Sequence, residues 1–198
     1  MAKATKGAAE PKVLTVSSAS RWEDWLAKHH EDTPQGVWLR LFKKSSARKS
    51  PTYVEAVEVA LCFGWIDGQA KSYDDESRVQ RFTPRRPRSV WSKINTQRVD
   101  RLLDAGRMQP AGLAAVELAK GDGRWARAYD PPSTATAPDD FLAELAKNNK
   151  AQAFYRTLDR RNTYSVAYRL QSATSPETRA KRIKAMIEMF ERGEKFHD

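Results

Sequence analysis

Alternation of apolar and polar positions predicts a small antiparallel sheet in the first part of the chain. Short strands are expected at Val13–Val16 and at Val37–Lys44, where apolar residues alternate with other side chains. The stretches "WIDGQAK" and "SRVQRFTPR" flank an acidic turn at Tyr73–Glu76, which is the pattern of a β-hairpin.

Helical spacing predicts helices that pack against this sheet. The first is expected to begin after an N-cap at Ser17 or Ser18 and to face the core with Trp22, Trp25 and Leu26. The second has Ser50 as its expected N-cap, Pro51 in the first helical position and Gly64 as its stop. Its expected apolar face consists of Val54, Val57 and Leu61.

The rest of the chain reads as helical, interrupted by one linker. Helices are expected within Ser89–Gly106 and Gln109–Gly123, the former with Ile94, Val99, Leu102 and Leu103 at helical spacing. The Pro/Ser/Thr-rich stretch Asp130–Pro138 indicates a boundary. The last helix is expected to use Ser175 as its N-cap and to pack through Ile183, Met186, Ile187 and Phe190.

These elements predict an α+β fold, with a small antiparallel sheet and hairpin packed by helices and then a helical C-terminal lobe. The expected organisation is a flexible tail over 1–12, an α+β domain over 13–130, a linker over 131–138 and the lobe over 139–198. No apolar run approaches the ~20 residues of a membrane span, and the N-terminus lacks the apolar stretch of a signal peptide. With one cysteine, Cys62, no internal disulfide can form, so a cytoplasmic protein with a buried thiol is expected.

Charge suggests a class of partner. The formal net charge is +10, which favours polyanions such as nucleic acid, phosphate ligands or an acidic protein surface. The plain alternative is a basic globular protein with no anionic partner. The positions of the charged residues have to distinguish these two alternatives.

Signatures of known chemistry are missing from the sequence. His29, His30 and His197 have no second metal ligand at useful spacing, so no metal site and no cofactor are expected. Neither the strand–turn–helix serine motif nor a glycine-rich phosphate loop occurs. The acids Asp74–Glu76 are read as a solvated turn instead of a calcium site. Whether the protein is an enzyme stays open, and its catalytic residues stay unknown.

The most unusual stretch is Gly64–Asn95, in which aromatic residues are interleaved with arginines. Pro84 and Pro87 fix the backbone torsion φ and remove hydrogen-bond donors, so "TPRRPR" is expected to be extended and its guanidinium groups preordered for phosphate or carboxylate. The candidate ligand-binding residues are Trp65, Asp67, Arg81, Arg85, Arg86, Trp91, Lys93 and Asn95.

A structural interpretation competes with this one. Trp65 and Phe82 are read as core residues of a half-buried sheet, and the arginines could dock the C-terminal lobe through Asp139, Asp140 and Glu144. With the hairpin centred as expected, Asp67 lies roughly opposite Arg81, although a one-residue slip would invert the faces.

Three hypotheses follow from this stretch, each with its own discriminating feature. The first is a non-catalytic protein that binds an anionic small molecule or an acidic protein surface. The second is an enzyme whose uncharacterised site includes Asp67 and Arg81, as a lone acid in a basic, aromatic neighbourhood suggests. The third is nucleic-acid binding, which predicts strong salt dependence but lacks a known binding motif. The oligomeric state cannot be read from the sequence.

Several segments together resemble a known family. "ALCFGWID", "RFTPR", "WSKIN" and "ETRAKRI", within a likeness from about Val13 to Arg192, are similar to the YdeI/OmpD-associated family, also called bacteriocin-protection proteins. The resemblance implies a role in stress or antimicrobial resistance and carries no agreed reaction, cofactor or catalytic residue. The segment from Pro138 onward resembles the part by which the family is usually recognised.

Overall fold

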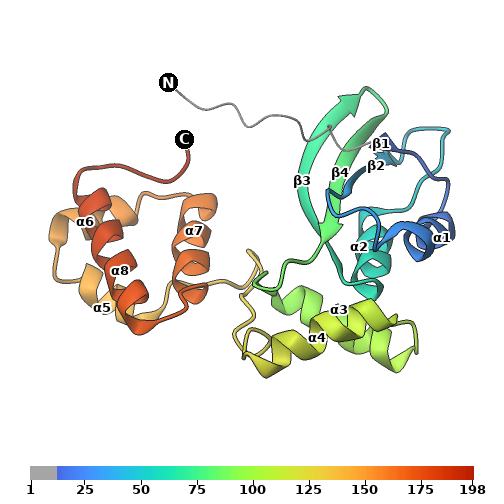
Figure 1. Ribbon diagram of the computed structural model, residues 1–198. Helices are drawn as coiled ribbons and strands as arrows, with labels where there is room; N and C mark the ends of the chain where they lie inside the picture. Colours follow the sequence, from blue (N-terminus) through green and yellow to red (C-terminus); the bar gives the residue numbers. More distant parts are fainter. Residues whose placement is uncertain (1–12) are drawn as a thin grey trace, which may run out of the picture. The chain divides into compact units, whose positions relative to one another are not determined.

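The computed structural model describes residues 13–198, and the predicted tail over 1–12 lies outside that range. The described chain has the predicted α+β architecture, with a four-stranded sheet and helices (Figure 1). Its first part contains β1 (Val13–Leu14), α1 (Ala19–His29), β2 (Val37–Phe42), α2 (Tyr53–Cys62), β3 (Trp65–Asp74), β4 (Ser77–Pro84), α3 (Lys93–Asp104) and α4 (Pro110–Gly121). Its second part contains α5 (Asp139–Leu145), α6 (Asn149–Tyr155), α7 (Arg160–Gln171) and α8 (Pro176–Glu191).

The chain divides into two compact units. The first, the sheet unit, comprises the described residues up to Ser89 together with Arg98–Gly121. The second, the bundle unit, comprises Val90–Gln97 together with Asp122–Asp198. The division falls within α3, so each unit contains a discontinuous piece of the chain.

The sheet has the strand order β1-β2-β4-β3 and is mixed. β2 pairs antiparallel with β4 and β3 pairs antiparallel with β4, but β1 runs parallel to β2. A wholly antiparallel sheet was expected, and the difference has a topological reason. The connection from β1 to β2 passes through α1, and a crossover of this kind joins parallel strands, whereas tight hairpins join antiparallel ones.

The predicted hairpin is confirmed, and its turn is fixed by Asp74. β3 and β4 are joined through Asp75 and Glu76, and the hairpin extends beyond α1 and α2 (Figure 1). The Asp74 carboxylate accepts hydrogen bonds from the Ser77 hydroxyl at 2.6 Å and from the Glu76 backbone N–H at 3.1 Å. The Ser77 hydrogen bond is the main reason why the pKa of Asp74 lies below its usual value. The turn is therefore stabilised by its own polar groups.

One sheet face packs against α1 and α2 through aromatic residues. Trp22 of α1 is fully buried, stacks on Trp25 at 5.4 Å and contacts Phe82 of β4 at 5.5 Å. Its indole N–H donates to the carbonyl of Ala56 in α2 at 3.1 Å, which satisfies its one polar group inside the core. Ser18 is the N-cap of α1, which confirms one of the two predicted alternatives, Ser17 and Ser18.

The beginning of α2 differs from the prediction. Its N-cap is Thr52, whose hydroxyl accepts from the Glu55 N–H while the Glu55 carboxylate accepts from the Thr52 N–H at 2.8 Å. This reciprocal capping box needs Glu or Gln three residues after the cap, and Ser50 has Tyr53 at that position. Ser50 instead accepts a hydrogen bond from the Phe42 N–H at 2.9 Å.

Two apolar residues assigned to packing faces are exposed instead. Val54, in the first turn of α2, is 47% exposed, whereas Val57 and Leu61 are buried as predicted. Ile94, in the first turn of α3, is 38% exposed, whereas Val99 is buried. Both exceptions lie at helix beginnings, where helical spacing alone cannot tell whether a neighbouring element covers the first turn.

Two glycines allow α2 and α4 to approach closely. Gly64 ends α2 with φ +70°, as its role as a stop signal predicts. A Cβ atom at Gly112 would lie 2.2 Å from the carbonyl oxygen of Cys62, so any side chain there would clash with the α2 backbone. Cys62 is buried, as predicted, and burial raises the pKa of its thiol to about 11.

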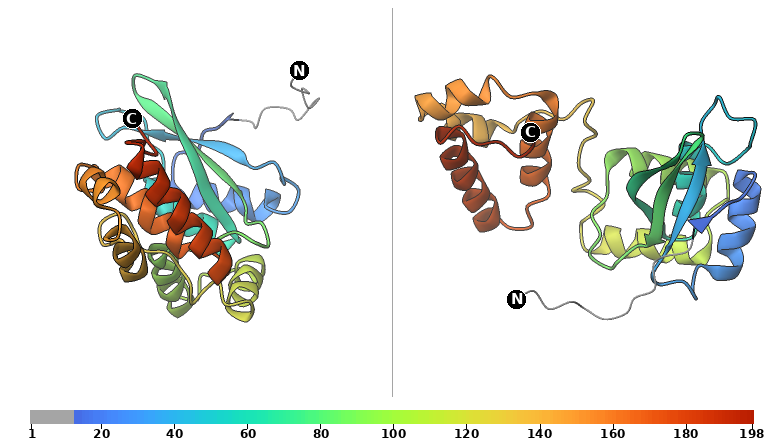
Figure 2. Two further views of the ribbon diagram at one scale, coloured as in Figure 1. Left: turned by 90° about the vertical axis from the view of Figure 1, so that its left-hand side faces the viewer. Right: turned by 90° about the horizontal axis from the view of Figure 1, so that it is seen from above.

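The four C-terminal helices form a bundle with its own apolar core (Figure 2). Phe141, Val166, Leu170 and Phe190 are fully buried in it. Ser175 caps α8 and Pro176 occupies its first turn, both as predicted. The predicted stripe of α8 also faces this core.

A buried asparagine attaches the C-terminal segment to the bundle. Asn162 of α7 is 1% exposed, and its side-chain oxygen accepts from the backbone N–H groups of Phe196 and His197, each at 3.0 Å. Its amide group donates to Asp159 at 2.8 Å and to the carbonyl of His197 at 3.1 Å. These hydrogen bonds hold Phe196 against the ring of Phe190, 6.2 Å away.

Candidate functional site

The predicted ligand-binding residues are distributed over both units. Five belong to the sheet unit, namely Trp65, Asp67, Arg81, Arg85 and Arg86, and the other three, Trp91, Lys93 and Asn95, belong to the bundle unit. The surroundings of each residue decide what it can offer to a ligand, so the two groups are described separately.

The aromatic members are core residues, as the structural interpretation expected. Trp65 is 1% exposed, lies edge-on to Trp22 at 6.4 Å, and donates its indole N–H to the His30 carbonyl at 3.3 Å. Phe82 is fully buried beside them. In the bundle unit, Trp91 is 2% exposed and packs against Trp125 at 4.9 Å.

Asp67 and Arg81 lie on opposite faces of the sheet. The observed register pairs Asp67 with Phe82, so the expected pairing of Asp67 with Arg81 is wrong by one residue. Successive side chains of a strand point to opposite faces. Asp67 therefore shares the helix-covered face with Phe82, where the Tyr53 hydroxyl donates to its carboxylate at 2.7 Å. Two irregularities in β3, one between Asp67 and Ala70 around Gly68 and one between Ser72 and Asp74, shift its pairing with β4, so counting back from the turn does not give the partner of Asp67.

Arg81 belongs to the opposite face, where cations cover an aromatic ring. Arg81 is paired with Trp38 of β2, its guanidinium lies 5.7 Å from the Trp38 ring, and it donates to the Gln35 carbonyl at 2.8 Å. The Lys71 ammonium lies 4.7 Å from the same ring. These cation–π contacts restrict the two side chains, and Trp38 is left only 8% exposed.

The arginine run after Thr83 differs in exposure from residue to residue. Arg85 is partly buried, and its backbone N–H donates to the Gly64 carbonyl at 2.9 Å. Arg86 and Arg88 are exposed, and the segment turns at Pro87 and Arg88 instead of continuing as an extended strand. The Arg86 N–H donates to the Ser89 hydroxyl at 3.0 Å, which helps to hold that turn.

Lys93 and Asn95 take part in contacts within the bundle unit. The Lys93 ammonium lies 2.7 Å from the Asp130 carboxylate, and this hydrogen bond is the main reason why the pKa of Asp130 is lowered. Asn95 is 7% exposed, and its backbone N–H donates to the Ser92 carbonyl at 3.0 Å.

Two of the acids that were offered as partners of the arginine run pair within the bundle instead. Asp140 forms a two-pronged ion pair with Arg179, with distances of 2.6 and 2.8 Å. Glu144 pairs with Lys147 at 2.6 Å. Both acids are thus supplied with a cation by their own unit.

A basic groove in the sheet unit was not singled out from the sequence. It consists of two adjoining hollows of about 550 and 380 Å³ that share Ser17, Phe42, Arg48 and Lys49 as lining residues. The remaining cations of the groove are Arg21 in the first hollow and Lys43 and Lys44 in the second. The stretch "KKSSARK" contains four cations within seven residues, and this density is the signal that could have identified the groove.

Hydrogen bonds from serines hold the loop that carries these cations. The Ser46 N–H donates to the Lys43 carbonyl at 3.0 Å, and the Ser46 hydroxyl accepts from the Arg48 N–H at 3.1 Å. The Lys43 N–H donates to the Glu76 carbonyl of the hairpin turn at 2.8 Å. The loop backbone is therefore ordered by the protein itself.

The charges of the groove are poorly balanced. Among residues 13–198, the one carboxylate that lines it is Glu55, which is engaged in the capping box of α2, and the hydrogen bond from the Thr52 N–H is the main reason why its pKa is lowered. Arg21 has Asp24 at 3.5 Å in a highly exposed pair. Lys43, Lys44, Arg48 and Lys49 are all exposed.

Other kinds of site find little support in the described chain. Within residues 13–198 there is no cluster of three or more His, Cys, Asp or Glu side chains that could hold a metal ion. No helix among these residues is long and apolar enough to cross a bilayer.

These features define an α+β domain with a basic groove and a helical bundle, and the comparisons with known proteins divide the chain similarly. Residues 14–115 match the family described as Domain of unknown function (DUF8412), and the chain belongs to this family. Residues 134–193 match the family described as Bacteriocin-protection, YdeI or OmpD-Associated. The resemblance noted from the sequence is thus confirmed for the C-terminal part, while the N-terminal part matches a separate family. Neither curated proteins nor solved structures give a match.

Proposed function

We propose that the protein binds an anionic, phosphate-bearing ligand in the basic groove of the sheet unit. The observation that carries this proposal is the set of exposed cations Lys43, Lys44, Arg48 and Lys49 around two adjoining hollows. In the described part of the chain, the one carboxylate that lines these hollows is already engaged. Phosphate groups carry several negative charges and accept charge-assisted hydrogen bonds from lysine and arginine, so they fit this set best.

The order of the loop adds to the expected affinity. A flexible lysine-rich segment would lose conformational entropy on binding, whereas the loop from Lys43 to Ser50 is already held by Ser46, Ser50 and the hairpin turn. Phe42 contributes as well, because the guanidinium groups of Arg40 and Arg48 lie 4.6 and 5.1 Å from its ring. These contacts direct Arg48 toward the hollows that it lines.

The exposed end of the arginine run is the rival location for the same function. Arg86 and Arg88 are exposed cations of the same unit, and Arg86 belongs to the set predicted from the sequence. They also make a matched control, because a double substitution there removes the same charge as one in the groove.

Titration of the full chain with pyrophosphate at low ionic strength, followed by calorimetry, tests the proposal. The double variant Arg48→Ala/Lys49→Ala should lower the affinity at least about tenfold, because each lost charge-assisted hydrogen bond contributes about 1.5–3 kcal/mol and rearrangement recovers part of it. Arg86→Ala/Arg88→Ala should change the affinity less than about twofold.

The other outcomes are equally informative. Equal losses in both double variants would show that only the overall charge matters and would reject the groove. A loss confined to Arg86→Ala/Arg88→Ala would move the site to the arginine run. Duplex DNA could instead bind much more tightly than pyrophosphate, with the logarithm of its binding constant falling against the logarithm of the salt concentration by a slope of about −0.9 per phosphate contacted. That result would identify the ligand as nucleic acid.

A further inference from the structure

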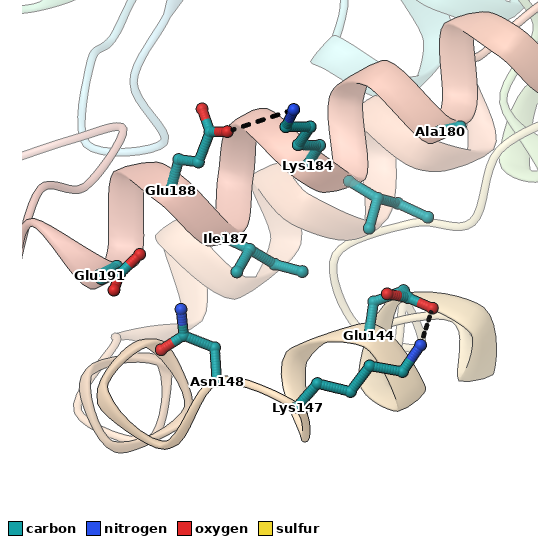
Figure 3. Close-up of a pocket in the computed structure, with 9 residues that line it drawn as sticks. Glu144, Lys147, Asn148, Ala180, Lys184, Ile187, Glu188 and Glu191 are labelled. Carbon is teal, nitrogen blue, oxygen red and sulfur yellow. Dashed lines mark hydrogen bonds and ion pairs between the residues drawn. The ribbon is translucent and has the colours of Figure 1, made fainter.

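The bundle unit contains a second groove, whose character differs from that of the basic groove. It lies between α8 and the turn from α5 to α6 and encloses about 530 Å³, within the usual range of small-ligand sites (Figure 3). Its floor is formed by Ile183 and Ile187, which are separated by one helical turn. We call it the bundle groove.

The charged side chains along its rim neutralise one another in pairs. Glu144 lies 2.6 Å from Lys147, and Lys184 lies 3.9 Å from Glu188, each pair within one turn of chain. Figure 3 shows the Lys184–Glu188 pair on the side of α8 that faces away from Lys147 and Asn148. The rim therefore contributes little net charge along most of the groove.

One end of the groove is different, because Glu191 of α8 and Asn148 of the α5–α6 turn both line it there. Among residues 13–198, no hydrogen bond or ion pair engages the Glu191 carboxylate. The Asn148 oxygen accepts from the Ala151 N–H at 3.0 Å and thereby caps α6, while its amide nitrogen points toward α8 (Figure 3). A chain with a net charge of +10 thus has a groove that ends at a carboxylate without a hydrogen-bonded partner, and the Arg192 side chain is near enough for the charge of Glu191 to contribute to the raised pKa of Arg192.

We propose that the bundle groove binds an aliphatic amine. The alkyl chain would lie on Ile183 and Ile187 and lose its contact with water, and the terminal ammonium would pair with the Glu191 carboxylate. An alkyl carboxylate of the same length would meet repulsion at Glu191, and an alkyl alcohol would lack the ion pair. The preference for the ammonium over the hydroxyl is therefore the signature of this site, and it is independent of anion binding in the sheet unit.

Binding of octylamine, octanol and octanoate to the full chain tests the proposal, with affinities measured by nuclear magnetic resonance titration. Octylamine should bind about two- to fivefold more tightly than octanol, as an exposed ion pair allows, and octanoate should bind most weakly. Glu191→Gln should abolish the preference for the amine and leave octanol binding unchanged. Glu177→Gln, which removes a carboxylate from the first turn of the same helix and outside the groove, should keep the preference.

A second pair of variants tests the apolar floor. Ile187→Ala should weaken octylamine and octanol alike, by about three- to tenfold, because both lose the same apolar contact. Met189→Ala alters a residue that packs against the same core but does not line the groove, so it should leave both affinities unchanged. Failure of folded wild-type protein to bind any octyl compound, or equal affinity for octylamine and octanol, would overturn the proposal.

Discussion

The two grooves differ in how their charged residues find partners. In the basic groove, Lys43, Lys44, Arg48 and Lys49 lie close together on one loop, which contains no acid to neutralise them. In the bundle groove, each lysine has a glutamate three or four residues away, Lys184 with Glu188 within α8 and Lys147, in the turn after α5, with Glu144 of that helix. Helical spacing brings such residues together, whereas a loop of like charges leaves its cations to an external anion. The ligands that we propose for the two units therefore carry opposite charges.

The largest expected effect is a loss of stability in the bundle unit that leaves ligand binding by the sheet unit unchanged. Phe141→Ala removes a fully buried ring from the bundle core and should lower the free energy of unfolding of the bundle by about 3–5 kcal/mol. Pyrophosphate binding by the sheet unit should stay within about twofold of the wild-type value. Urea unfolding followed by circular dichroism, together with calorimetry, measures both.

A matched control is available in the next residue. Leu142 is 40% exposed, so Leu142→Ala should cost less than about 1 kcal/mol. If Phe141→Ala weakens pyrophosphate binding as strongly as a groove variant does, the two units do not act separately and the contrast between them fails.

A smaller effect is expected from the close approach of α2 and α4 in the sheet unit. Gly112→Ala would place a Cβ atom 2.2 Å from the Cys62 carbonyl oxygen, and the backbone would have to shift. We expect a destabilisation of about 1–3 kcal/mol in urea unfolding. A Cβ atom at Gly121, in the same helix, would meet nothing within 4 Å, so Gly121→Ala should be neutral or slightly stabilising. Equal stability of the two variants would contradict this account of the packing.

The smallest effect concerns the pH dependence of the bundle. The hydrogen bond from Arg179 is the main reason why the pKa of Asp140 is lowered, so the pair stabilises the folded state above the carboxyl's ordinary pKa of 3.8. This contribution should be lost as the pH falls below that value and through the lowered pKa of the folded state. Because Asp140 is 48% exposed, we expect less than about 1 kcal/mol.

The measurement is the urea midpoint of the wild type and of Asp140→Asn between pH 5 and pH 2, a range of about three units around the carboxyl titration. The variant should be less stable at pH 5 and should converge with the wild type at the acid end. A constant difference in urea midpoint across the range would show that the contribution of Asp140 to stability does not depend on its charge.

Local signals were sufficient for most secondary-structure elements. Ser18 and Ser175 cap helices where the sequence placed them, Gly64 ends α2, and the acidic turn closes the hairpin. Each of these features depends on a few neighbouring residues, so the local sequence specifies it. The sequence also contains the pattern of the α2 capping box, because Glu55 follows Thr52 by three residues. Ser50 and Pro51 nevertheless suggested that the helix begins earlier.

The sequence by itself determined most helices, the hairpin and the excess of positive charge, whereas it left open whether Trp65 and Phe82 are buried or bind a ligand. Tertiary structure decided which side chains share a face or a groove. Two irregularities in β3 set the register that puts Asp67 and Arg81 on opposite faces, and the folding of the Lys43–Ser50 loop beside α1 made a groove from a basic stretch. Propensity and spacing act over a few residues, whereas register and grooves depend on contacts between segments far apart in the chain, which no local pattern encodes.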